Sequence, residues 1–100
     1  MKTIKCYHIS PINNREKILK EGLIPNSKNT GVIQYNNRVF VSTDKNRLAF
    51  DYVDFNDIDV YEFEISESKL KLDEFADFEC FRYIEEKVDK NNLKLIDTIY

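Results

Sequence analysis

Three places in the chain carry polar side chains where an apolar run begins or ends. His8, the single histidine, lies two residues before Ser10, the run Ser-Thr-Asp at 42–44 follows an apolar segment, and Glu79 opens the segment Glu-Cys-Phe. A carboxylate in such a place must face solvent, meet a partner or act on a ligand. Each group also has an ordinary role, as a histidine bonded to a carbonyl, a helix N-cap or a charge at a strand start. Their chemistry therefore depends on whether the fold brings them together.

Alternation of apolar and polar residues predicts most of the elements that would position these groups. Strands are predicted over residues 3–9, 38–43, 57–66, 79–84 and 93–100. In the third of these, Tyr61, Phe63 and Ile65 would face inward. In the first, His8 would share a face with Cys6. The pattern is typical of an α+β fold with more strand than helix, in a single domain spanning residues 1–100.

Two helices are predicted, both in the N-terminal half of the chain. The first begins at Asn13 or Asn14, ends near Glu21 before Gly22, and has Ile18 and Leu19 as its apolar stripe. The second begins at Thr43 or Asp44 and runs to about Tyr52. Residues 24–37 form a long Asn-rich loop, and residues 67–78 are a mixed segment that includes a turn.

Composition narrows the class of protein. With 42% hydrophobic and 13% aromatic residues the chain can bury a core, and a net charge of −3 disfavours an electrostatically driven nucleic-acid binder. No apolar run reaches about 18 residues, the length of a membrane span. The first residues lack the apolar core of a signal peptide, which predicts a cytoplasmic protein. Cys6 and Cys80 have no metal-ligand spacing; one disulfide is conceivable, but reduced thiols are expected.

Together the motifs resemble the ADP-ribosyltransferase fold, and within it the His-Tyr-Glu branch typified by diphtheria toxin and the poly-ADP-ribose polymerases. The segment YHIS at 7–10 is similar to that branch's Tyr-His-Gly-Thr strand. FVSTD at 40–44, followed by AFDY at 49–52, is similar to its strand ending in Ser-Thr-Asp before a helix with Ala-x-x-Tyr. GLIP at 22–25 is also similar to segments of the RNA 2′-phosphotransferase and DNA-modifying toxin branches. The resemblance implies a small fold of two packed, mainly antiparallel sheets.

The resemblance also implies NAD as co-substrate, with no metal. Tyr52 would stack on the nicotinamide ring over a floor made by the strand end at 42–43, and His8 would bind the adenosine-side ribose. The backbone near Ile9 and Ser10 would hold the nicotinamide amide, and Arg38 or Arg15 would contact the pyrophosphate. The implied NAD-binding residues are His8, Ile9, Ser10, Arg38, Ser42, Thr43 and Tyr52.

Glu79 is the expected catalytic residue. The resemblance implies that its carboxylate accepts a hydrogen bond from the 2′-hydroxyl of the nicotinamide ribose. It would also stabilise the oxocarbenium-like charge that develops as nicotinamide leaves. Glu86 is the alternative carboxylate, because it precedes a segment similar to the closing strand of the family. Asp77 would share the face of Glu79 if the strand extended backward. In arginine-modifying relatives a residue at that position orients the acceptor.

Several functions are compatible with these residues. The first is NAD-dependent transfer of ADP-ribose to a protein, nucleic acid or small acceptor by a bacterial or phage effector. The second is a catalytically inactive nucleotide-binding or protein-inhibitor protein on the same fold, favoured by Val41 where the family has an aromatic residue and Ile9 where it has glycine. The third is an RNA 2′-phosphotransferase-like enzyme, and the fourth a structural domain without these activities.

Overall fold

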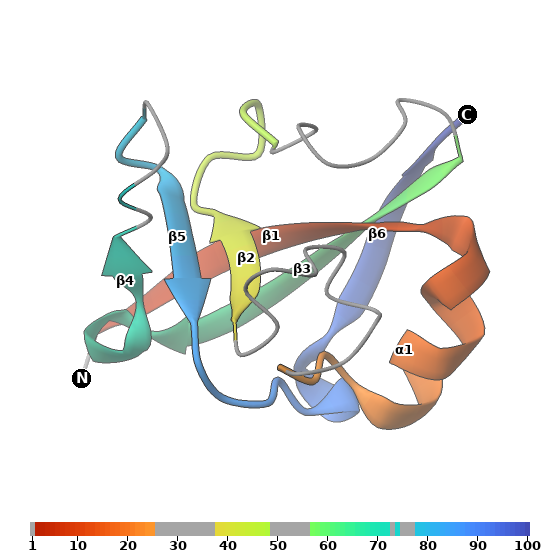
Figure 1. The fold of residues 1–100 in the computed structure, drawn as a ribbon, viewed down its shortest axis with the longest axis horizontal. Helices are drawn as coiled ribbons and strands as arrows, with labels where there is room; N and C mark the ends of the chain where they lie inside the picture. Colours follow the sequence, from red (N-terminus) through yellow and green to blue (C-terminus); the bar gives the residue numbers. More distant parts are fainter. Residues whose placement is uncertain (1, 26–37, 49–56, 73, 75–77) are drawn as a thin grey trace.

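The protein has an α+β architecture, which Figure 1 shows as a ribbon. The computed structural model describes residues 2–25, 38–48, 57–72, 74 and 78–100. The strands are β1 (Thr3–Pro11), β2 (Val39–Ser42), β3 (Ile58–Ser66), β4 (Lys71–Leu72), β5 (Phe81–Ile84) and β6 (Lys94–Ile99). The helix α1 (Arg15–Glu21) is joined by three short 3-10 helices, η1 (Ile12–Asn14), η4 (Glu67–Lys69) and η5 (Lys90–Asn92).

The described strands form one six-stranded antiparallel sheet in the order β4-β5-β2-β1-β3-β6. β1 pairs with β3 along its whole length, from Thr3 opposite Ser66 to Pro11 opposite Ile58. By contrast, β1 and β2 meet at a single register pair, Tyr7 opposite Ser42. In Figure 1, β2 and β5 accordingly run at a steep angle to β1 and β3. The expected division into two packed sheets is not confirmed, because β1 pairs on both sides and joins the two halves.

The central strand β1 is buried on both faces. Cys6 belongs to the larger hydrophobic cluster with Phe63 and Tyr61, while Ile9 packs with Val60 in a smaller cluster on the opposite face. Tyr61 and Phe63 are fully or almost fully buried, and Ile65 packs against the same cluster. The predicted inward face of β3 is therefore confirmed.

The first predicted helix is confirmed, with η1 preceding the seven-residue α1. Ile18 is completely buried, whereas Leu19 is 46% exposed, so only Ile18 fills the predicted apolar stripe. The helix ends before Gly22, which has φ of +85°. A Cβ at this position would lie 2.2 Å from the carbonyl oxygen of Val88. Glycine is required here both for its backbone conformation and for this close approach.

The second predicted helix does not begin where the sequence indicates. Residues 43–48 form a turn in which the Asp44 carboxylate accepts a hydrogen bond from the Asn46 amide (N···O 2.9 Å). The Asp44 amide donates in turn to the hydroxyl of Ser42 (3.1 Å). Short polar side chains that bond nearby amides in this way compete with helix formation. The rest of the predicted helix, residues 49–52, lies outside the described residues, as does most of the predicted loop 24–37.

Three further segments differ in detail from the predictions. The strand expected over 79–84 is observed as Phe81–Ile84, since 78–80 form a turn closed by a hydrogen bond from the Phe81 amide to the Phe78 carbonyl (3.1 Å). The strand expected over 93–100 is Lys94–Ile99. The mixed segment after β3 contains η4 and β4.

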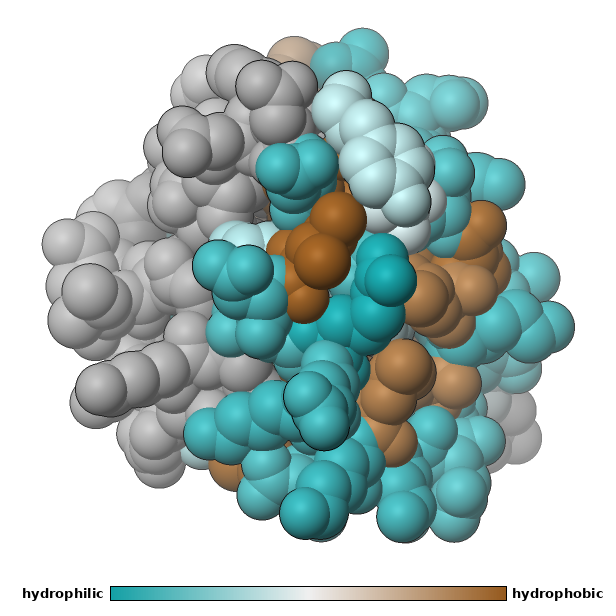
Figure 2. Space-filling view, turned by 90° about the vertical axis from the view of Figure 1, so that its right-hand side faces the viewer, coloured by the Kyte–Doolittle hydropathy of each residue, from teal (hydrophilic) through white to brown (hydrophobic). Residues whose placement is uncertain are grey.

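Figure 2 shows the side of the molecule that carries α1. Its described surface is mostly hydrophilic, with hydrophobic side chains in small, separate patches. Within the described ranges, no helix has the length and hydropathy needed to cross a membrane.

Candidate functional site

The candidate site lies where β1 and β2 separate. Next to the register pair of Tyr7 and Ser42, the imidazole of His8 bonds to the backbone of β2. Its Nδ1 donates a hydrogen bond to the carbonyl oxygen of Phe40 at 2.7 Å, and the side chain is 1% exposed. The histidine from the first motif is thus fixed against the strand that carries the second.

A second contact joins the end of β2 to the turn before β5. The amide of Thr43 donates to the carbonyl oxygen of Cys80 (2.9 Å), and its hydroxyl lies 3.4 Å from the same oxygen. Ser42 lies opposite Phe81 in the register of β2 and β5. Segments 7–10, 42–44 and 78–80, which are remote in sequence, therefore converge at one junction of the sheet.

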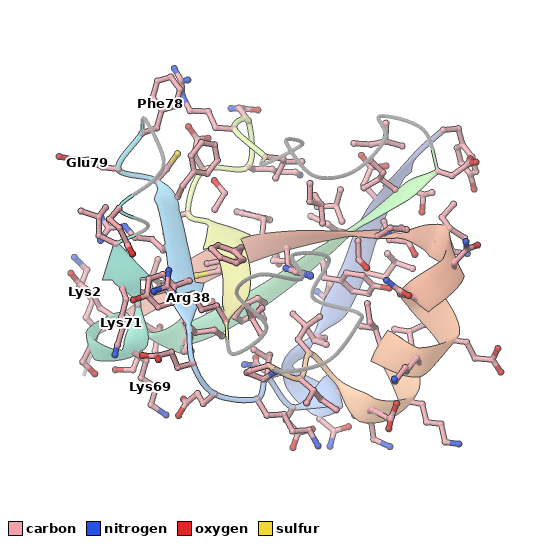
Figure 3. The ribbon with its side chains drawn as sticks, viewed as in Figure 1. Lys2, Arg38, Lys69, Lys71, Phe78 and Glu79 are labelled. Atoms are coloured by element: carbon pink, nitrogen blue, oxygen red, sulfur yellow. The ribbon has the colours of Figure 1, made fainter. Side chains whose placement is uncertain are left out.

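Glu79 belongs to this junction by its backbone, but its side chain is exposed. In Figure 3 it lies at the margin of the molecule and points outward. Its carbonyl oxygen accepts a hydrogen bond from Nε of Arg82 at 2.6 Å. Glu86 is also exposed and forms a surface ion pair with Lys69 (2.6 Å). The catalytic role of either glutamate stays a prediction.

The remaining predicted residues are distributed around the junction. Ser10 is buried and its hydroxyl accepts from Nδ2 of Asn14 (3.1 Å), whereas Ile9 belongs to the opposite hydrophobic cluster. The hydroxyl of Ser42 is engaged in the local turn with Asp44. Tyr52 lies outside the described residues, and so does Asp77.

The two arginines that were predicted to contact the pyrophosphate are both engaged by other residues of the protein. The guanidinium of Arg38 lies 3.9 Å from the centre of the Tyr83 ring and pairs with the carboxylate of Glu74 at 3.4 Å. Arg15 donates two hydrogen bonds to Asp59, from Nε at 2.9 Å and from Nη2 at 2.6 Å. Both guanidinium groups thus have protein partners.

Asp59 was not among the residues singled out in the sequence, although a signal existed. On the alternation of β3 it shares the inward face of Tyr61, so it is a carboxylate directed into the core. Burial alone would raise the pKa of Asp59, but hydrogen bonds from Arg15 and Thr98, together with the charge of Arg15, outweigh it and lower that pKa. Burial raises the pKa of Tyr61, whose hydroxyl therefore stays protonated and donates to Asp59 (3.4 Å). This network holds the start of α1 against the sheet.

Among the described residues, two pockets open beside these elements. One, of about 340 Å³, lies next to the end of β2 and is lined by Ile4, Thr43, Glu67, Leu70 and Arg82. The other, of about 300 Å³, lies between η4, the segment after β5 and η5. In the part of the chain that the structure describes, no group of three or more His, Cys, Asp or Glu side chains is placed to hold a metal ion. The first pocket includes Thr43 of the predicted site, and the second includes Glu86, the alternative catalytic carboxylate.

No protein-family model matches the chain, and neither does any curated protein or solved structure. The functional interpretation therefore rests on the residues and their geometry.

Proposed function

We propose that the protein is an NAD-dependent ADP-ribosyltransferase of the His-Tyr-Glu kind, acting in the cytoplasm as a bacterial or phage effector. The observation that supports this most strongly is the convergence of the three motif segments. His8 contacts β2 through the Phe40 carbonyl, and Thr43 contacts the turn of Glu79 through Cys80. Motifs that resemble one family would not need to meet in space if each had only a local structural role.

The arrangement of the sheet gives further support. The two halves of the sheet meet at one register pair and run at a steep angle to each other, so the junction lies between two nearly separate three-stranded units. That geometry is compatible with the two-layered fold that the resemblance implies. In the proposed reaction, Glu79 accepts a hydrogen bond from the 2′-hydroxyl of the nicotinamide ribose while Tyr52 stacks on the nicotinamide ring. The ADP-ribosyl group then passes to a macromolecular or small acceptor.

The test is nicotinamide release from NAD by the purified protein, with and without bacterial lysate as a source of acceptor. We expect Glu79→Gln to lower the rate by roughly 10²–10³-fold, because it removes a negative charge aimed at developing positive charge. Glu86→Gln is the matched control, since it changes another exposed glutamate, which lies beyond the opposite end of β5, and it should leave the rate unchanged. Absence of release from the wild-type protein in both conditions would contradict the proposal.

A second candidate is a catalytically inactive nucleotide-binding or inhibitor protein. The outward direction of Glu79 and the burial of Ile9 among core residues favour it. Such a protein would bind NAD or a partner without releasing nicotinamide. Both glutamine variants would then bind as well as the wild type does.

A further inference from the structure

The pocket beside the end of β2 combines four kinds of chemistry in a small space. Arg82 lies opposite Val41 in the register of β2 and β5, and Thr43 follows Val41 by two residues, just beyond the end of β2. Both Arg82 and Thr43 line the pocket. Ile4 of β1 and Leu70, which follows η4, supply apolar surface, and Glu67 supplies a carboxylate. Its volume of about 340 Å³ falls within the range of small-molecule sites, about 300–1,000 Å³.

Arg82 differs from the other arginines in how its guanidinium is used. The chain contains four arginines, and three of them have their guanidinium against a side chain. These contacts are Arg15 with Asp59, Arg38 with Tyr83, and Arg47 with Phe78. Arg82 instead donates from Nε to a backbone carbonyl, that of Glu79 (2.6 Å). Among the described residues no hydrogen bond or ion pair engages its terminal Nη atoms, which leaves these donors for a ligand.

A guanidinium group whose Nε is already hydrogen-bonded, and whose Nη atoms can still donate, is suited to bind a phosphate group. Its planar fork binds two oxygens at once, with charge-assisted hydrogen bonds about twice as strong as neutral ones. The Thr43 hydroxyl lines the same pocket, but its proton is directed to the carbonyl oxygen of Cys80 (3.4 Å), so Arg82 is the donor to such an anion. The Glu67 carboxylate would oppose it, but Glu67 is ion-paired with Lys2 (3.6 Å), which offsets its charge. Figure 3 shows Lys2 in this part of the molecule.

Glu67 and the apolar residues specify the rest of the ligand. A carboxylate accepts hydrogen bonds from hydroxyl groups, as a ribose diol provides, and Ile4 and Leu70 offer surface for a flat base. We infer that the pocket binds a nucleoside diphosphate, with Arg82 on the phosphates and Glu67 on the ribose. The binding of this ligand class stands on the pocket alone. Its identification as the ADP half of NAD rests on the proposed function, and it places the adenosine-side ribose at Glu67 in place of His8, which does not line this pocket.

Calorimetric titration of the purified protein with ADP, adenosine and inorganic phosphate tests the inference. We expect ADP to bind more tightly than either of the other two, because each of them fills only one part of the pocket. Arg82→Gln should weaken ADP binding by about tenfold or more, since it removes charged hydrogen bonds. Lys20→Gln is the matched control, since it removes an exposed cation on α1, outside the pocket lining, and it should bind ADP as the wild type does.

Several results would overturn the inference. It fails if ADP does not bind, if inorganic phosphate binds as tightly as ADP, or if Arg82→Gln binds ADP as the wild type does. Arg82→Lys guards against a folding defect: it keeps the charge and loses the fork, and its ADP affinity should lie between those of the wild type and Arg82→Gln. Equal affinity of the lysine and glutamine variants would also contradict a phosphate contact.

The same variants separate this inference from the proposed function. If the protein releases nicotinamide and Arg82→Gln leaves the KM for NAD unchanged, the function stands and the placement of the ADP half in this pocket is wrong. If ADP binding depends on Arg82 but no nicotinamide is released, the pocket stands and the proposed function is wrong. If both hold, Arg82→Gln raises the KM for NAD.

Discussion

The fully buried carboxylate of Asp59 is held by the guanidinium of Arg15 through two hydrogen bonds, at 2.6 and 2.9 Å. The hydroxyl of Thr98 donates a third, at 2.8 Å. This contact links the first residue of α1 to β3 and β6, so it fixes the helix on the sheet near the end of β1. Arg15 is consequently part of the framework of the candidate site and is not free to bind a ligand.

Asp59→Ala should lower the free energy of unfolding by about 3 kcal/mol, because it leaves the polar partners of a buried carboxylate without their acceptor. Arg15→Gln should destabilise in the same direction. Urea unfolding followed by circular dichroism measures both. As the control, Lys2→Gln removes an exposed ion pair with Glu67 (3.6 Å) and should cost about 0.5 kcal/mol or less. A variant of Asp59 as stable as the wild type would contradict the role of this network.

Because Asp59 is ionised and paired in the folded protein, we expect the stability of the protein to depend on pH. The folded-state pKa of Asp59 is lowered, so its ionised form stabilises the fold at pH above the unfolded value of about 4. This contribution is lost as the pH falls through the lowered folded-state pKa. The free energy of unfolding should therefore decrease below about pH 4 more steeply in the wild type than in Asp59→Asn. Urea titrations between neutral and acid pH test this, and identical slopes would exclude Asp59 as the source.

The substitution Gly22→Ala adds only one methyl group but should lower the free energy of unfolding strongly. The residue has φ of +85°, and its Cβ would lie 2.2 Å from the backbone oxygen of Val88, which cannot move as a side chain can. Leu23 and Val88 exchange two backbone hydrogen bonds at this point, at 2.9 and 3.0 Å. We expect a loss of about 1–3 kcal/mol. Glu21→Ala, one residue earlier on the exposed side of α1, should change the midpoint of thermal unfolding little. If Gly22→Ala had the same midpoint of thermal unfolding as Glu21→Ala, the close approach of residue 22 to the Val88 carbonyl would be contradicted.

The two cysteines should differ in reactivity. Burial raises the pKa of the completely buried Cys6 thiol to about 12, whereas Cys80 is half-buried. Because the thiolate is the reactive form, an alkylating reagent at pH 8 should label Cys80 and leave Cys6 unmodified until urea is added. Mass spectrometry of Cys80→Ser and Cys6→Ser separates the two sites. Rapid labelling of native Cys80→Ser would show that Cys6 is accessible.

The sequence predicted those features that depend on neighbouring residues. Alternation located β3 and the buried Tyr61 and Phe63, and glycine after a helical pattern located the end of α1. The sequence also predicted a helix that begins at Thr43 or Asp44, because hydroxyl and carboxylate side chains often cap helices. The same side chains also stabilise local turns, and here the hydrogen bond between Asp44 and Asn46 stabilises a turn.

Long-range relationships were beyond the sequence. The carboxylate of Asp59 meets Arg15 from another element, and the sequence alone offered no reason to pair them. Similarly, the motifs at His8 and Thr43 could be identified one by one, but their convergence depends on the register of β1, β2 and β5. Arg82 was not singled out because an arginine within a strand has no signal of its own until its neighbours across the sheet are known.

In the proposed function, segments 7–10, 42–44 and 78–80 form one NAD site in which nicotinamide is cleaved from ribose. Proton–nitrogen NMR of the labelled protein, titrated with NAD, tests it in one sample, since free nicotinamide has its own proton signals. We predict that the amides of all three segments shift together at the same NAD concentration, that those of η5 (Lys90–Asn92) do not, and that nicotinamide accumulates. Shifts confined to other segments, or their absence together with intact NAD, would contradict the account.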